Sequence, residues 1–189
     1  MKRIWTILLL AGAVRAADVT VYQTGHHVVD NAVRNAAMGS ASKLFAGIGI
    51  RLDWKAGRRD GRAATTTILL QYTMGTPEHP GAMAFARPFD PERVITVMYD
   101  RILAESASNP STRAAVLAYT LTHEIGHVLM RSDTHSREGI MKASWGDEDR
   151  ALMLLRRLRF LPEEEVLIRQ GLERDSAEAF QKGDSVREF

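Results

Sequence analysis

The stretch His-Glu-Ile-Gly-His at positions 123–127 constrains this chain more than any other feature of its sequence. Two histidines four residues apart on a helix lie one turn above each other on the same face, so both imidazoles can point at one metal ion. Glu124 lies beside them, displaced around the helix, where a carboxylate can take a proton from metal-bound water. Zinc is the expected ion, because catalytic zinc sites favour imidazole ligands and keep one position open for water.

The residues around this motif are apolar, which predicts a buried helix over positions 112–131. Charged and imidazole groups inside a buried helix need partners, and a metal ion is the obvious one. The alternative is that the motif is only two solvated histidines beside an acid. Gly126 lowers helix stability, which indicates that another residue packs closely against it, and Met141 is the candidate.

The first sixteen residues have the pattern of a secretory signal peptide. Lys2 and Arg3 precede an apolar run over positions 4–14, which is too short to span a bilayer, and small residues end the segment. An uncleaved anchor or a buried first strand is the alternative. We therefore expect a secreted or periplasmic bacterial protein that has no stable membrane anchor once the signal is cleaved. We also expect it to be a monomer. Its removal changes the formal net charge from +2 to −1, so nothing suggests a nucleic-acid partner.

The remaining length is enough for one domain with a substantial core, which we assign to residues 17–175, with a frayed tail at 176–189. The chain has no cysteine. This excludes thiolate ligands and thiol nucleophiles, and an exported protein without disulfides must rely on its core and its metal for stability.

Hydrophobic periodicity predicts a chain that alternates strands and helices before the motif and is helical after it. Asp30 and Asn109 are expected to cap helices. The adjacent histidines His26 and His27, and also His79, are weaker candidates for ligands and are expected in loops. The predicted strands cover positions 19–24, 48–55, 65–73 and 93–102, with an edge strand near 82–87, and the predicted helices cover 28–46, 112–131, 147–160 and 163–172.

Two histidines do not complete a catalytic zinc site, so a third protein ligand is required. Three residues downstream can supply it. Asp133 lies six residues after His127, His135 lies eight residues after it, and Glu148 lies on the next predicted helix. Imidazole suits zinc, which favours His135, but the sequence leaves all three open.

The motif, together with the methionine of Gly-Ile-Met at 139–141, resembles the metzincin metallopeptidases. The order of predicted strands and helices before the motif is also similar. The resemblance implies an α+β, metzincin-like zincin fold: a twisted mixed sheet with an antiparallel edge strand, a zinc-site helix, a methionine turn (Met-turn) beneath the metal, and C-terminal helices. It also implies that a peptide or protein substrate binds as an added strand along the edge strand, here near Ala82–Arg87.

The chain departs from that family at two positions. Met130 stands where metzincins have a glycine turn, and Asp133 stands at the usual position of the third ligand. His-Glu-Ile-Gly-His followed by His135-Ser136 and Gly-Ile-Met is more similar to small exported bacterial proteins of unassigned role. Those proteins carry asparagine at the Asp133 position, a poor zinc ligand, and histidine at the His135 position, so this resemblance favours His135.

We therefore expect an exported zinc-dependent endopeptidase in which His123, His127 and His135 hold zinc and Glu124 is the general base. One alternative is a catalytically silent binding module that keeps the zinc; Glu124 argues against it, because a structural zinc site does not need that acid. Another is a hydrolase of a different substrate. The small residues of the edge strand leave its backbone accessible, which suits peptides.

Overall fold

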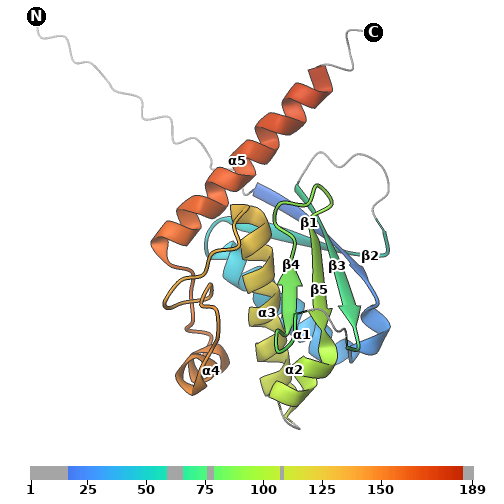
Figure 1. The fold of residues 1–189 in the computed structure, drawn as a ribbon, viewed down its shortest axis with the longest axis vertical. Coiled ribbons are helices and arrows are strands. Elements are labelled where there is room, and N and C mark those ends of the chain that lie inside the picture. The colour runs from blue at the N-terminus through green and yellow to red at the C-terminus, as the bar shows by residue number, and fades with distance from the viewer. Residues whose placement is uncertain (1–16, 59–65, 76–78, 107–108, 185–189) are drawn as a thin grey trace, which may run out of the picture.

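The computed structural model describes residues 17–58, 66–75, 79–106 and 109–184 (Figure 1). The predicted signal peptide and the last residues of the predicted tail lie outside them. The described strands form one five-stranded sheet in the order β2-β1-β3-β5-β4. Neighbouring strands are parallel, except that β4 pairs antiparallel with β5 at the edge, as predicted. The strands are β1 (Ala17–Thr24), β2 (Ile50–Ala56), β3 (Thr66–Thr73), β4 (Ala84–Ala86) and β5 (Val94–Met98).

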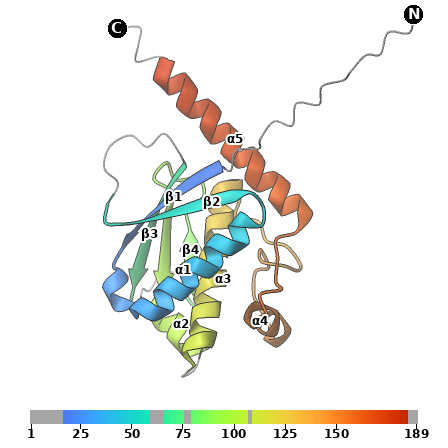
Figure 2. The same ribbon diagram turned by 180° about the vertical axis from the view of Figure 1, so that it is seen from behind.

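Two long helices, α1 and α3, pack against each other and lie across one face of the sheet (Figure 2). Asp30 caps α1 by accepting hydrogen bonds from two backbone amides, and Asn109 caps α3 in the same way, as predicted. The helices are η1 (His26–Val28, a 3₁₀ turn), α1 (Asn31–Ala46), α2 (Tyr99–Glu105), α3 (Pro110–Met130), α4 (Asp147–Leu154) and α5 (Pro162–Asp184).

The core lies between the sheet and these two helices. Every residue of α3 from Val116 to Met130 is buried, which confirms the predicted buried helix. The three central strands β1, β3 and β5 contribute valine, isoleucine and leucine side chains that are fully or almost fully buried, as expected for parallel strands covered by helices. In the described part of the chain, no helix is long and apolar enough to cross a membrane.

The C-terminal helix α5 crosses the end of α3 at very short range. A side chain at Gly171 would place its Cβ 1.7 Å from the carbonyl oxygen of Leu129, so only glycine allows this contact. The two helices also make one of the larger sets of contacts in the fold. The end of α3, where the motif lies, is therefore held from outside by the last helix of the chain.

Three predicted elements ended four or more residues from the predicted position. The strand predicted over 93–102 ends at Met98, where α2 begins. The helix predicted over 147–160 ends at Leu154, because Arg156 takes a left-handed conformation with φ 56°. The last helix does not end near Leu172 but continues as α5 to Asp184, through most of the segment that we expected to be frayed.

Candidate metal centre

Three histidine side chains converge at the C-terminal half of α3. The Nε2 atom of His127 lies 2.9 Å from that of His123 and 3.3 Å from that of His135. His123 and His127 are buried on one face of the helix, and His135 is an exposed residue of the loop that follows it. One ligand atom from each lies within 4.8 Å of the others, so the three can hold one metal ion.

Each of the two buried histidines forms a hydrogen bond through its Nδ1 atom, which leaves its Nε2 atom free to bind a metal. Nδ1 of His123 lies 2.8 Å from the carbonyl oxygen of Ile140, and Nδ1 of His127 lies 2.8 Å from that of Ser132. A carbonyl oxygen only accepts, so each Nδ1 carries the proton and donates it. When these rings are neutral, their Nε2 atoms therefore present lone pairs to each other, an arrangement that a shared cation stabilises.

The electrostatics of the site keep these rings neutral. Burial lowers the pKa of His123 to about 3, with the neighbouring charge of His127 acting in the same direction. Burial also lowers the pKa of His127. Because a histidine must be neutral to bind a metal, both rings are in the ligating form at neutral pH. The donor set of three imidazoles fits zinc.

The other candidate ligands lie outside this group. Among the described residues, the histidine triad is the group of potential ligands that converges on one point, and it includes neither Asp133 nor Glu148. Asp133 is an exposed residue near His127 that raises the pKa of that ring through its charge. His26 and His27 form the 3₁₀ turn after β1, and His79 precedes the edge strand.

Glu124 points into the same cleft from the next position on α3. Its side chain is buried, and burial raises its pKa to about 8, although a hydrogen bond from the backbone of Ala86 opposes this effect. Ala86 belongs to the edge strand β4. The carboxyl group that we expect to act as a base is therefore held between the histidines and the strand along which a substrate is expected.

Met141 packs against α3 at Gly126, between the two histidines in sequence, as predicted. A Cβ at Gly126 would lie 2.8 Å from the sulfur of Met141 and 3.3 Å from the ring of Phe160. Glycine therefore allows the Met-turn to pack directly beneath the two histidines. Trp145 also belongs to the site, although it was not predicted there: its ring contacts that of His123 edge-on, with the centroids 5.4 Å apart. Its place four residues after Met141 was the available signal.

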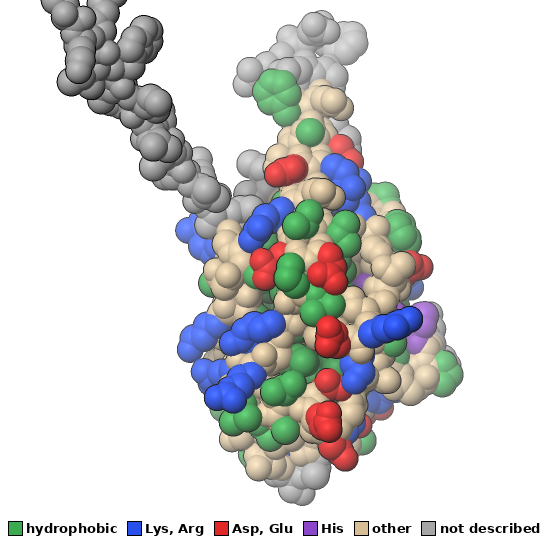
Figure 3. Space-filling model, turned by 90° about the vertical axis from the view of Figure 1, so that its left-hand side faces the viewer, with side chains coloured by type: hydrophobic (Ala, Val, Ile, Leu, Met, Phe, Trp, Pro, Cys, Tyr) green, Lys and Arg blue, Asp and Glu red, His purple; other side chains and the backbone are tan. Residues whose placement is uncertain are grey.

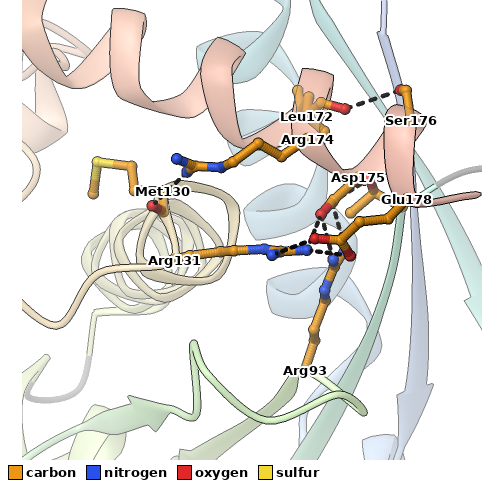
Figure 4. A network of polar contacts seen from close by, with 9 residues as sticks. Arg93, Met130, Arg131, Leu172, Arg174, Asp175, Ser176 and Glu178 are labelled. Atoms are coloured by element: carbon orange, nitrogen blue, oxygen red, sulfur yellow. Dashed lines mark hydrogen bonds and ion pairs between the residues drawn. The ribbon is translucent and has the colours of Figure 1, made fainter.

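The helix that carries the histidines ends one residue later than the resemblance implies. Met130 is still helical, and Arg131 makes the left-handed turn with φ 52° and ψ 49°. Such a conformation costs a non-glycine residue about 1 kcal/mol. Ion pairs offset this cost: the Arg131 guanidinium contacts Asp175 at 2.8 Å and Glu178 at 2.7 Å, both on α5 (Figure 4). Arg93 also pairs with Asp175, whose side chain is only 10% exposed.

A second contact from α5 holds the loop beside His135. The hydroxyl of Ser136 donates a hydrogen bond of 2.6 Å to the buried carboxylate of Glu164, whose other oxygen accepts from the backbone amide of Leu161. The backbone amide of Ser136 donates to the carbonyl oxygen of Met141 at 2.8 Å. The loop between His127 and the Met-turn is therefore fixed at Arg131 before His135 and at Ser136 after it. Sequence patterns gave no sign of this support.

The histidines open into a cleft of about 460 Å³ between β4 and the loop after α3. In the ladder with β5, Arg87 donates to Val94 and Met98 donates to Met83. Since hydrogen-bonding directions alternate along a strand, the backbone groups of Ala84 and Ala86 face away from β5. The free edge of β4 therefore lies along the cleft.

Neither a protein-family model nor a curated protein sequence matches the chain. Among solved structures, it is similar to an archaemetzincin from Methanopyrus kandleri, with a TM-score of 0.54 and 16% identity over 87% of this chain and 99% of that one. Myroilysin is a weaker match, with a TM-score of 0.40 and 14% identity over 79% of this chain and 71% of that one. The first similarity establishes that the fold is metzincin-like, as predicted.

Proposed function

We propose that the chain is a zinc-dependent endopeptidase. The observation that carries this proposal is the convergence of three imidazoles, two of them oriented by Nδ1–H donation to backbone carbonyls, beside the buried Glu124. Three protein ligands would leave a coordination position open for water, as in catalytic rather than structural zinc sites. We assign His123, His127 and His135 as the ligands.

Zinc, when bound, supplies a Lewis acid that polarises the scissile carbonyl and lowers the pKa of water. The remaining roles belong to the chain. Glu124 accepts the proton of the attacking water and delivers it to the leaving amine, which requires the ionised carboxylate. Burial raises its pKa to about 8 in the metal-free protein, and a bound cation would favour the ionised form. Met141 packs beneath the histidine rings and contacts no reacting atom in this assignment.

The substrate is a peptide or protein segment bound in an extended conformation along β4. The backbone groups of Ala84 and Ala86 face away from β5, on the edge where a substrate strand could pair. Ala86 is half-buried and Ala84 is buried, so a substrate would bind along a strand that is only partly exposed. Such binding depends mainly on the peptide backbone, so it supports an endopeptidase that accepts many sequences. This site needs no second copy of the chain, and we propose a monomer.

The test is the metal content and peptide hydrolysis of the purified protein, with and without a chelator. About one zinc ion per chain is expected, with activity lost on chelation and restored by zinc. His123→Ala or His127→Ala should abolish tight binding, because two ligands cannot hold zinc against water. Full zinc retention in both variants would end the zinc assignment.

Glu124→Gln separates catalysis from metal binding. It keeps the shape of the side chain and removes the base, so zinc should stay bound while turnover falls on the order of 10²-fold or more. Unchanged turnover would show that Glu124 is not the base. A zinc-loaded parent that hydrolyses no member of a broad peptide library would instead support the catalytically silent binding module.

We also propose export, on the strength of the first sixteen residues. Expression of the full-length gene in a bacterial host, followed by N-terminal sequencing of the purified product, tests it. A mature chain that begins near Asp18 in the periplasm or medium is expected. A product that starts at Met1 and stays in the cytoplasm or membrane would refute cleavage.

A further inference from the structure

A second cavity, larger than the metal cleft, lies on the other side of α3. It has a volume of about 750 Å³, within the range of about 300–1,000 Å³ that is usual for small-molecule sites. The residues of α3 that line it fall on the face opposite His123, Glu124 and His127. It is bounded by α1 and α3, which pack side by side, and by α4 and the segment that follows it (Figure 2).

Small side chains on both helices create this space. Alanines on α3 and an alanine and a serine on α1 line it, together with larger apolar side chains. A peptide ligand buried here would need partners for its backbone amides and carbonyls, and the described lining offers few polar groups besides its charged ones. The walls therefore suit a hydrocarbon chain. The uncharged lining consists of Ala36, Ser40, Leu44, Gly47, Ile48, Ser111, Ala114, Ala115, Ala118, Tyr119, Met153, Leu154 and Phe160.

Positive charge gathers at this cavity. Lys43, Arg156 and Arg159 line it, and in the described part of the chain none of them forms an ion pair with a carboxylate. Glu165 is the one acidic residue among the lining, and it pairs with Arg169 at 3.4 Å. Figure 3 shows Lys and Arg side chains beside hydrophobic ones on the face that α4 and the start of α5 form.

Two of these cations act on the phenol of Tyr119, to which Arg159 also hydrogen-bonds. Burial raises the pKa of that hydroxyl, and the charges of Arg159 and Arg156 both oppose the rise. The same hydroxyl lies 3.3 Å from the carbonyl oxygen of Leu158 and donates to it. Two guanidinium groups therefore border an apolar space beside one neutral polar group, a combination that matches an anionic head joined to an apolar tail.

We propose that this cavity binds a single-chain anionic amphiphile, a long-chain carboxylate, with its alkyl chain between α1 and α3 and its carboxylate among Lys43, Arg156 and Arg159. The alkyl chain fills space that the small side chains leave. The carboxylate is the acidic partner that none of the three cations has among the described residues, where Arg159 hydrogen-bonds to neutral groups, the carbonyl oxygen of Leu158 and the side chain of Tyr119. This site is independent of the proposed zinc chemistry.

Calorimetric titration of the full-length protein with octanoate, decanoate and dodecanoate, each below its micellar concentration, tests the proposal. One molecule should bind per chain, and affinity should rise about four-fold for each added methylene, which is the effect of burying one CH₂ group. Dodecyltrimethylammonium, with the same tail and the opposite charge, should bind at least tenfold more weakly than dodecanoate. Equal binding of the two head groups, or affinity independent of chain length, would overturn the proposal.

Variants locate the site on the protein. Arg159→Glu should weaken dodecanoate binding at least tenfold, and Ala115→Trp should do the same by filling the space between the helices. Arg157→Glu is the matched control. Arg157 is exposed and close in sequence to both lining arginines, but it does not line the cavity. The affinity of this variant for dodecanoate should therefore stay within about two-fold of that of the parent.

Equal losses in Arg157→Glu and Arg159→Glu would mean only general attraction to a basic surface and would refute the site. Circular dichroism melts check that each variant folds, and Ser40→Leu replaces Ala115→Trp if that protein does not. All titrations are repeated with a chelator present, where binding should be unchanged. The titrations can therefore be interpreted even if the zinc proposal fails.

Discussion

The buried carboxyl group of Glu124 should make the stability of the metal-free protein fall as pH rises. In the unfolded chain its pKa has the ordinary value of 4.5, whereas burial raises it to about 8 in the folded protein. Below pH 4.5 both states bind the proton. Between pH 4.5 and 8 the unfolded state releases it while the folded state keeps it, so stability is lost over this window and the loss is complete above pH 8.

The size of this effect follows from the difference between the two pKa values. At 1.36 kcal/mol per unit of pKa, it corresponds to at most about 5 kcal/mol. Water entry and side-chain movement around the ionised carboxylate reduce the penalty, but several kcal/mol should remain. Glu124→Gln carries a neutral side chain of the same shape at every pH and should escape the loss.

Urea unfolding of the metal-free parent and of Glu124→Gln at pH 5, 7 and 8.5 measures this difference. The free energy of unfolding of the variant should be close to that of the parent at pH 5 and exceed it by several kcal/mol at pH 8.5. His123 changes stability with pH in the opposite direction. Its pKa is lowered in the folded protein, so it reduces stability only as pH falls below 6.5. This contribution is the same in the parent and in Glu124→Gln. Glu138→Gln, an exposed change in the loop, controls for the substitution itself.

Zinc provides an internal check on this reasoning. A divalent cation held by the adjacent histidines favours the ionised carboxylate, so zinc should reduce or remove the advantage of Glu124→Gln at pH 8.5. A difference between parent and variant that stays constant from pH 5 to pH 8.5 without metal would show that the carboxylate is well solvated, and the burial argument would then be wrong.

The site and its supports give three further predictions. His135→Ala should weaken zinc affinity more strongly than Asp133→Ala, whose effect should stay within the 10–100-fold typical of a residue that orients a ligand. Competition with a chromophoric chelator measures the zinc affinities of the two variants, and the reverse order would make Asp133 the ligand. Gly126→Ala should cost about 1–3 kcal/mol in urea unfolding, since its methyl group would lie 2.8 Å from the Met-turn sulfur. Asp175→Ala should cost about 3 kcal/mol, because it leaves two partly buried arginines short of a partner, and a loss below 0.5 kcal/mol would refute that role.

The parts of the fold that local sequence determines were predictable. Asp30 and Asn109 provide side-chain acceptors for the first amides of their helices, and each helix begins next to its cap. The closeness of Gly126 and Met141 was also predicted, because a glycine inside a buried helix requires a neighbour that replaces the missing side chain. In each case the physical cause lies within a few residues or in one residue type.

The boundaries that failed lacked such local causes. Tyr99 and Ile102 are buried three residues apart on α2, but the β-formers before them made the segment read as one strand. Helix α4 ends through a left-handed Arg156, where a glycine would have signalled the turn. Helix α5 continues past Leu172 to Asp184, and Asp175 and Glu178 within this part pair with distant arginines. These partners are not visible in the polar local sequence, which alone suggested fraying.

The same long-range cause explains the unusual spacing of the third histidine. Because α3 runs through Met130 and turns at Arg131, the loop starts one residue later than a glycine turn at position 130 would place it. Ser136, held by Glu164 and by the backbone of Met141, then fixes the loop immediately after His135. Two of these contacts come from α5: Glu164 holds Ser136 and Glu178 holds Arg131, 28 and 47 residues away in sequence. The position of the third imidazole is thus set by the C-terminal helix, which is why spacing within the motif could rank Asp133 and His135 but could not decide between them.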